Sequence, residues 1–168
     1  MKYYIDSEFI EDGKTIDLLS LAIVREDGAE RYLVNQEADR SKASDWVKEN
    51  VLPQLDSHPE NGIYFEGTRA DIAVSVREFV VPEAKPEIWG YYAAYDWVAF
   101  CQIFGAMIDL PKGYPMFCRD IIQECKRLGN PALPEQGKGE HHALLDARWN
   151  KKSHEFLIAL ASKQPPSA

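Results

Sequence analysis

The feature that most restricts the fold of this chain is an apolar run at residues 17–25 with an Asp-Gly pair on each side. Asp12-Gly13 precedes the run and Asp27-Gly28 follows it. A short apolar run between turn residues predicts a buried strand, and Asp-Gly favours a hairpin turn. Because strands are also expected at Lys2–Asp6 and Glu30–Asn35, the first third of the chain predicts an antiparallel meander.

The rest of the chain has apolar residues at helical spacing, interrupted by strand-like segments. A buried strand is expected at Ile88–Ala93. Helices are expected at residues 41–53, 68–79, 95–104, 120–128 and 142–161. The first of these has Trp46 and Val47 on its apolar side, with Val51 and Leu52, and is expected to end at Pro53. Alternating helices and strands indicate parallel pairing. We therefore predict an α/β fold that resembles ribonuclease H: a mixed β-sheet, made of an antiparallel meander and parallel strands, flanked by helices.

Two internal segments and the last residues are expected to be irregular. Residues 56–67 are expected to form a loop, and residues 129–140 are rich in proline and glycine, which disfavour regular structure. Residues 164–168 are expected to be a disordered tail. This leaves residues 1–163 as a single domain.

The composition limits the classes of protein to consider. The 168 residues are 45% hydrophobic, which is enough for an ordinary core. No run approaches the roughly 18 consecutive apolar residues of a membrane span, and the N-terminus lacks the apolar core of a signal peptide. The spacing of Cys101, Cys118 and Cys125 fits neither a disulfide framework nor a thiolate metal site. We therefore expect a cytoplasmic protein with reduced cysteines and no membrane partner.

Four carboxylates stand where a metal site would need them. Asp6 and Glu8 are two residues apart at the end of a predicted strand, so their side chains point to the same face. Asp96 follows an apolar strand, where open α/β sheets place their ligands. Asp146 lies beside the apolar face of the last helix, five residues after His141. Oxygen ligands favour Mg²⁺ or Mn²⁺, although each position alone also fits a loop charge, a helix cap or an ion pair.

These residues resemble, in order, the three motifs of the DEDDh superfamily of 3′-5′ exonucleases. The first motif is Asp6-Ser7-Glu8, the second contains Asp96, and the third is His141-His142-Ala143-Leu144-Leu145-Asp146. The longer segments 6–13 and 94–99 are similar to the RNase AS branch, the small exoribonucleases that trim adenylate-rich RNA 3′ ends. The similarity covers nearly the whole chain.

The resemblance implies a metal-dependent 3′-5′ exoribonuclease that releases nucleoside 5′-monophosphates from the 3′ ends of single-stranded RNA. It also implies adenylate preference and a homodimer. Two Mg²⁺ or Mn²⁺ ions would be held by Asp6, Glu8, Asp96 and Asp146. His141 would be the general base, with His142 as the alternative. Two such ions would also offset part of the net charge of −8, which otherwise disfavours binding to phosphates.

Residues close to the motifs are candidates for contact with RNA. Phe9, Tyr95 and Trp97 are expected to stack on terminal bases, and Phe9 is the first choice because it follows a motif carboxylate directly. The basic candidates near the third motif are Lys138, Arg148, Lys151 and Lys152, with Lys138 and Arg148 as the first choices. The alternatives are core packing for the aromatic side chains and an ordinary solvated surface for the basic ones.

Other functions fit the same residues. One is a DNA exonuclease or an oligonucleotidase of the same superfamily, because the sequence does not separate the two sugars. Another is a non-catalytic module that binds nucleic acid, although repelling carboxylates are costly to keep without a metal. The third is a zinc hydrolase that uses His141, His142, His154 and a carboxylate, although the spacing of these histidines suits zinc poorly.

Overall fold

The computed structural model describes residues 1–55, 57 and 63–163, and these residues form a mixed six-stranded sheet of order β4-β3-β2-β1-β5-β6. The strands are β1 (Lys2–Glu11), β2 (Ile16–Arg25), β3 (Glu30–Asn35), β4 (Ile63–Gly67), β5 (Glu87–Gly90) and β6 (Arg119–Asp120). β2 pairs antiparallel with β1 and with β3, whereas β4 pairs parallel with β3, β5 with β1 and β6 with β5. The expected ribonuclease H-like sheet is confirmed.

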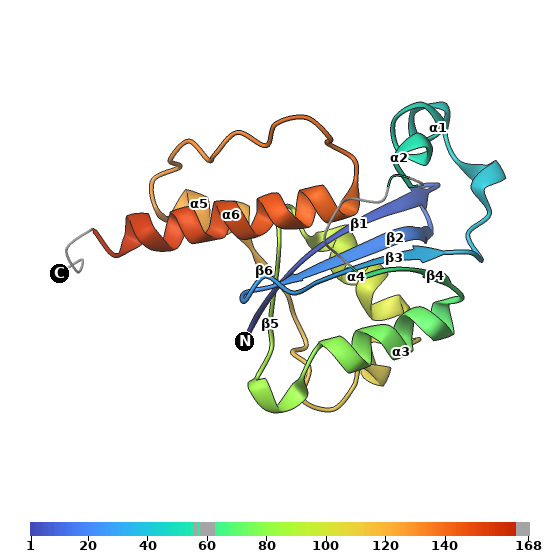
Figure 1. The fold of residues 1–168 in the computed structure, drawn as a ribbon, viewed down its shortest axis with the longest axis horizontal. Coiled ribbons are helices and arrows are strands. Elements are labelled where there is room, and N and C mark those ends of the chain that lie inside the picture. The colour runs from blue at the N-terminus through green and yellow to red at the C-terminus, as the bar shows by residue number, and fades with distance from the viewer. Residues whose placement is uncertain (56, 58–62, 164–168) are drawn as a thin grey trace.

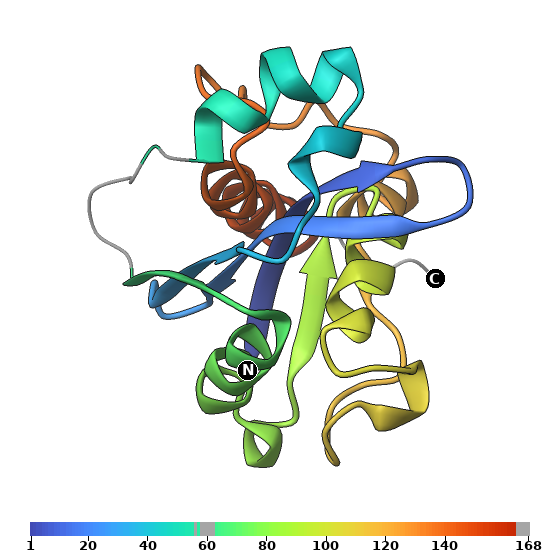
Figure 2. The same ribbon diagram turned by 90° about the vertical axis from the view of Figure 1, so that its right-hand side faces the viewer.

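Helices cover both faces of the sheet (Figure 1). One face carries α3 (Arg69–Phe79) and α4 (Ala94–Gln102), and the other carries α5 (Ile121–Arg127) and the long α6 (Ala143–Ala161). Two short helices, α1 (Asp45–Asn50) and α2 (Leu52–Leu55), lie beside the outer end of the β1–β2 hairpin (Figure 2). Short 3-10 turns occur at Arg40–Lys42, Pro82–Ala84 and Met107–Asp109.

The side chains of the central strands alternate between two cores. On β1, Ile5 packs in the core under α3 and α4, whereas Tyr4 packs in the core under α5 and α6. This is the two-residue period of a strand whose two faces are both buried. Asp6 and Glu8 continue the side of Tyr4, which faces α6, and Ser7 continues the side of Ile5, which faces α4.

The inner edge of β1 is open where the short strand β5 stops. The pairing of β1 with β5 ends at Tyr4. Beyond it, the carbonyl of Ile5 accepts a hydrogen bond of 2.9 Å from the side-chain amide of Asn150 on α6. The N–H of Ser7 donates a hydrogen bond of 2.8 Å to the carboxylate of Asp96 on α4. The open edge thus binds one helix from each face of the sheet.

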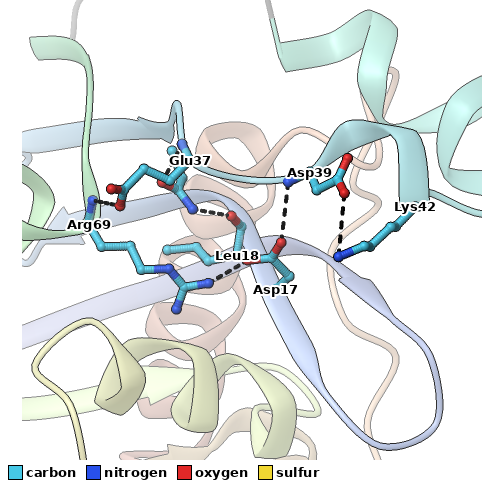
Figure 3. Close-up of polar contacts among 7 residues, drawn as sticks. Asp17, Leu18, Glu37, Asp39, Lys42 and Arg69 are labelled. Atoms are coloured by element: carbon cyan, nitrogen blue, oxygen red, sulfur yellow. Dashed lines mark hydrogen bonds and ion pairs between the residues drawn. The ribbon is translucent and has the colours of Figure 1, made fainter.

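A polar network holds the segment that leads from β3 to α1 (Figure 3). The guanidinium of Arg69 pairs with Asp17 of β2, and the N–H of Arg69 donates to Glu37 at 2.9 Å. The N–H of Asp39 donates to Asp17 at 3.4 Å, and Lys42 pairs with Asp39 at 3.4 Å. This network ties the residues before α1 to β2 and to the start of α3.

Two local expectations were wrong. Residues 63–67 were expected to lie in a loop, but they form β4, an edge strand with a mixed and partly exposed sequence that pairs with β3. Pro53 was expected to end a helix, but it lies in the first turn of α2, where a proline costs no backbone hydrogen bond. The expected tail at 164–168 lies outside the described residues.

Other expectations hold in the described part of the chain. Residues 129–140 contain neither helix nor strand, and the three cysteines are free. None of the described helices combines the length and the apolar composition needed to cross a membrane.

We expect the stability of the fold to depend on pH through His154. Its buried ring stacks on Trp89, with 3.7 Å between the ring centroids, and its Nδ1 lies 3.0 Å from the Tyr4 hydroxyl. Burial, followed by the charge of Lys2, lowers the pKa of His154 from 6.5 to about 4. Between these values the unfolded chain binds a proton that the folded protein excludes. The free energy of unfolding therefore falls as the pH drops through this window.

The measurement is chemical denaturation of the wild type and of His154→Gln, an uncharged variant that keeps a polar partner for Tyr4. Between about pH 7 and about pH 4.5, the wild type should lose about 2 kcal/mol more than the variant. Because the other titrating groups are common to both proteins, their contributions cancel in the comparison. An identical pH dependence in the two proteins would contradict the role of His154.

Candidate active site

Three carboxylates converge beside the open edge of β1. Asp6 and Glu8 of β1 and Asp146 of α6 each offer one oxygen, and these oxygens all lie within 4.8 Å of one another. The three side chains are partly buried. Like charges this close repel strongly unless a cation or a proton lies between them. The donor set, which consists of oxygens alone, fits a hard divalent cation such as Mg²⁺ or Mn²⁺.

Asp96 reaches this group from the opposite face of the sheet. It lies in the first turn of α4 and is buried. Its Oδ1 accepts hydrogen bonds from the N–H of Ser7 at 2.8 Å and from the Ser7 hydroxyl at 2.6 Å. The group of three does not include Asp96, but its charge helps to raise the pKa of Asp6. Asp96 is therefore an immediate neighbour of the three carboxylates.

Burial is the largest cause that raises the pKa of all four carboxyls, and nearby negative charges add to the rise. For Asp6 the pKa is well above its ordinary value, first because of burial and then because of the charges of Asp96 and Asp146. Burial and the charge of Asp146 raise the pKa of Glu8 to about 8. Burial also raises the pKa of Asp96 to about 6 and that of Asp146 to about 6, despite the hydrogen bonds that each accepts. The ionised cluster is therefore destabilising in the absence of a counterion.

The two adjacent histidines point to different places. His141 has a φ of +67°, in the left-handed region, and its N–H donates to Oδ2 of Asp146 at 3.0 Å. His142 is buried and caps α6: its Nδ1 accepts from the N–H of Leu144 at 3.2 Å. The proton of this ring is therefore on Nε2, which donates to the carbonyl of Ser57 at 3.0 Å. His142 thus has a capping role, and His141 is left beside the carboxylates.

A cavity of about 620 Å³ brings the carboxylates and His141 together with aromatic side chains. Phe9 and Tyr95 stack on each other at one wall, with 5.7 Å between the ring centroids and 18° between the ring planes. Trp46 of α1 and Tyr92 also line the cavity, and both are exposed. A polar floor and aromatic walls suit a nucleotide, whose phosphate and base need different surroundings.

Three residues predicted to contact RNA are not among the described residues that line this cavity. Trp97 packs against the core and stacks on Phe100, with 5.4 Å between centroids. Arg148 forms a two-point ion pair with Glu30, at 2.8 and 2.6 Å. Lys138 is exposed in the loop before α6. Core packing and ion pairing account for the positions of Trp97 and Arg148.

The structure places three further residues at the candidate site that the sequence did not indicate as site residues. Asn150 lies one helical turn after Asp146, and this spacing of four residues could have revealed it. Gln136 donates its side-chain amide to Asp146 from an irregular loop, and no sequence signal marks it. Trp46 was expected on the buried side of its helix, but it is 53% exposed.

Comparison with known proteins finds similarity to one family over most of the chain. The sequence model of the 3′-5′ exoribonuclease Rv2179c-like domain matches residues 1–158. Two relatives come from Mycobacterium tuberculosis: the 3′-5′ exoribonuclease MT2234.1 of strain CDC 1551 / Oshkosh and the 3′-5′ exoribonuclease Rv2179c of strain ATCC 25618 / H37Rv. Each is 40% identical over 150 residues, which are 88% of this chain and 88% of the relative.

We expect Glu8→Gln to stabilise the protein when divalent cations are removed by a chelator. The pKa of Glu8 rises from 4.5 to about 8 on folding, so the folded protein keeps a proton that the unfolded chain releases between these values. The free energy of unfolding of the wild type therefore falls as the pH rises through this window. At about pH 8 the variant should be more stable by on the order of 2 kcal/mol, with little difference at about pH 5.

Denaturant titrations in chelator would measure this, with Glu11→Gln as the control. Glu11 lies on the same strand, but its carboxylate is exposed, so its neutralisation should change stability little. If the two substitutions changed the free energy of unfolding equally at about pH 8, the ionised carboxylate of Glu8 would not be a specific source of destabilisation.

Proposed function

The chain belongs to the Rv2179c-like family of 3′-5′ exoribonucleases, and on this basis we propose that it shortens single-stranded RNA by a metal-dependent reaction that releases nucleoside 5′-monophosphates. The observation that carries the proposal is the convergence of Asp6, Glu8 and Asp146, whose oxygens lie within 4.8 Å of one another. Such a cluster of partly buried acids has no evident use in packing. It suits a reaction at a phosphate, where negative charge must be offset.

Two ions, Mg²⁺ or Mn²⁺, fit the donor set. One would be held by the three clustered carboxylates, and the second by Asp6 and Asp96. When bound, the ions would activate a water on one side of the scissile phosphate and stabilise the leaving 3′ oxygen on the other. The hydrogen bonds from Ser7 to Asp96 and from Asn150 to the carbonyl of Ile5 hold the carboxylates on the rigid part of the sheet. Fixed ligands of this kind lower the cost of assembling the site.

His141 is the proposed general base. Its imidazole lines the cavity, and its main-chain N–H is bound to Asp146, so the residue is tied to the cluster that receives the phosphate. A neutral imidazole can take a proton from the attacking water near neutral pH. His142 is a poor candidate because both of its ring nitrogens are engaged, one with Leu144 and the other with Ser57.

The aromatic wall of the cavity is the proposed site for the 3′-terminal base. Tyr95 is 52% exposed and stacks on Phe9, so the pair presents a flat surface on which a base can lie. Stacking tolerates every base. The proposed adenylate preference rests on the similarity of residues 6–13 and 94–99 to the RNase AS branch.

Asp6→Asn and Asp146→Asn should each abolish hydrolysis, because each removes a charge from the metal cluster while keeping the size of the side chain. The measurements are the stepwise shortening of 5′-labelled homopolymer RNAs and matched DNA on gels and the release of nucleoside monophosphates by chromatography, in Mg²⁺ and in Mn²⁺. Wild type should degrade adenylate RNA fastest, and a 3′-phosphate block should slow the reaction. Asp27→Asn, an exposed acid in the β2–β3 turn, is the control. Full activity in either Asp6→Asn or Asp146→Asn would contradict the proposed mechanism.

A pair of asparagine variants should distinguish the roles of His141 and His142. Asparagine tolerates the left-handed φ at position 141 and remains a good helix cap at position 142. His141→Asn should lower kcat by about 10²- to 10⁴-fold with normal stability. His142→Asn should keep most of the activity but lose about 1–3 kcal/mol of stability, because the carbonyl of Ser57 loses its partner. The reverse pattern would assign the base to His142.

A further inference from the structure

The α1–α2 segment is fastened to both sides of the active site. Val51 and Leu55 pack in a small core with Ile10 of β1 and Leu19 of β2. Beyond α2, the carbonyl of Ser57 receives the hydrogen bond from the ring of His142. The segment therefore spans from the strand that carries the metal carboxylates to the start of α6 (Figure 2).

Trp46 is the residue of this segment that meets His141. The two rings pack edge to face, with 4.8 Å between their centroids and 80° between their planes. Trp46 contributes little to the core, since it is 53% exposed, while its neighbour Val47 faces the small core. Its main chain is fixed, because its carbonyl accepts from the side chain of Asn50 at 2.8 Å. The contact with His141, rather than exposure alone, points to a role of this ring at the site.

His141 needs such a neighbour. The hydrogen bond to Asp146 fixes the main chain of His141 but leaves its side chain free to rotate about the Cα–Cβ bond. The left-handed backbone at this position is uncommon for residues other than glycine, although histidine adopts it more readily than most. A base that samples several rotamers would be correctly placed for only part of the time, and small errors in placement cost large factors in rate. The ring of Trp46 limits these rotations.

We propose that Trp46 is a positioning residue for the reaction: by packing against the imidazole of His141, it holds that ring toward the carboxylate cluster. The proposal rests on the proposed function, in which His141 is the base. It assigns to α1 a part in catalysis although none of the metal carboxylates lies on that helix. The competing role for an exposed tryptophan at a nucleotide cavity is stacking on the RNA itself.

Steady-state kinetics on adenylate RNA would separate the two roles. For Trp46→Ala we expect kcat to fall by about 10- to 100-fold with less than about a threefold change in KM. Trp46→Phe keeps a ring of the right orientation and should recover most of the lost kcat. Glu49→Ala, an exposed position on the same helix, controls for disturbance of α1. A large rise in KM at unchanged kcat would overturn the proposal in favour of stacking on RNA.

A second readout does not depend on activity. Diethyl pyrocarbonate modifies accessible imidazoles, and tandem mass spectrometry distinguishes His141 from His142. The rate at His141 should rise several-fold in Trp46→Ala and stay near the wild-type value in Trp46→Phe. An unchanged rate in Trp46→Ala would overturn the contact. If the rate rises but His141→Asn remains fully active, His141 is not the base and Trp46 is not a positioning residue. The contact between the two rings would still be confirmed by the change in rate.

Discussion

The site depends on the place where β5 stops pairing with β1. Past that point, main-chain groups of β1 lack a neighbouring strand, and helices from opposite faces of the sheet bind them instead. Asn150 of α6 binds the carbonyl of Ile5, and Asp96 of α4 binds the N–H of Ser7. Because strand side chains alternate, the acids of β1 face α6 while Ser7 faces α4. A sheet in which β5 continued along β1 would keep both helices away from this edge.

The carboxylate cluster links function to stability. Burial and repulsion raise the pKa values of Asp6, Glu8, Asp96 and Asp146 together, so the ionised site opposes folding at neutral pH. Such strain is typical of sites whose geometry is selected for a ligand rather than for stability. Under the proposed function, divalent cations would relieve the strain and also supply the positive charge that a chain of net charge −8 lacks for binding RNA.

The sequence predicted the residues whose geometry depends on local structure alone. The spacing of Asp6 and Glu8 places both side chains on one face of any strand. Asp146 was found by its motif, and it reaches the other two only because α6 packs on that face of the sheet. The positions of Trp97 and Arg148 could not be foreseen, since the partners that hold them, Phe100 and Glu30, depend on packing around the completed fold. β4 was missed because an edge strand shows weak alternation. Trp46 was misplaced because periodicity does not say which apolar residue stays outside.

The unequal lengths of the strands have a consequence for motion. β1 and β2 have ten residues each, whereas β3 has six and β5 has four. The outer part of the β1–β2 hairpin is thus a narrow ribbon, with a shift in register between Glu8 and Phe9, braced mainly by the small core around Ile10. Ribbons of two strands are marginally stable. Local opening is therefore easiest beyond Glu8, while the acids on the inner part of β1 stay fixed. Under the proposed function, the wall that carries Phe9 would move to admit a base without disturbing the carboxylates.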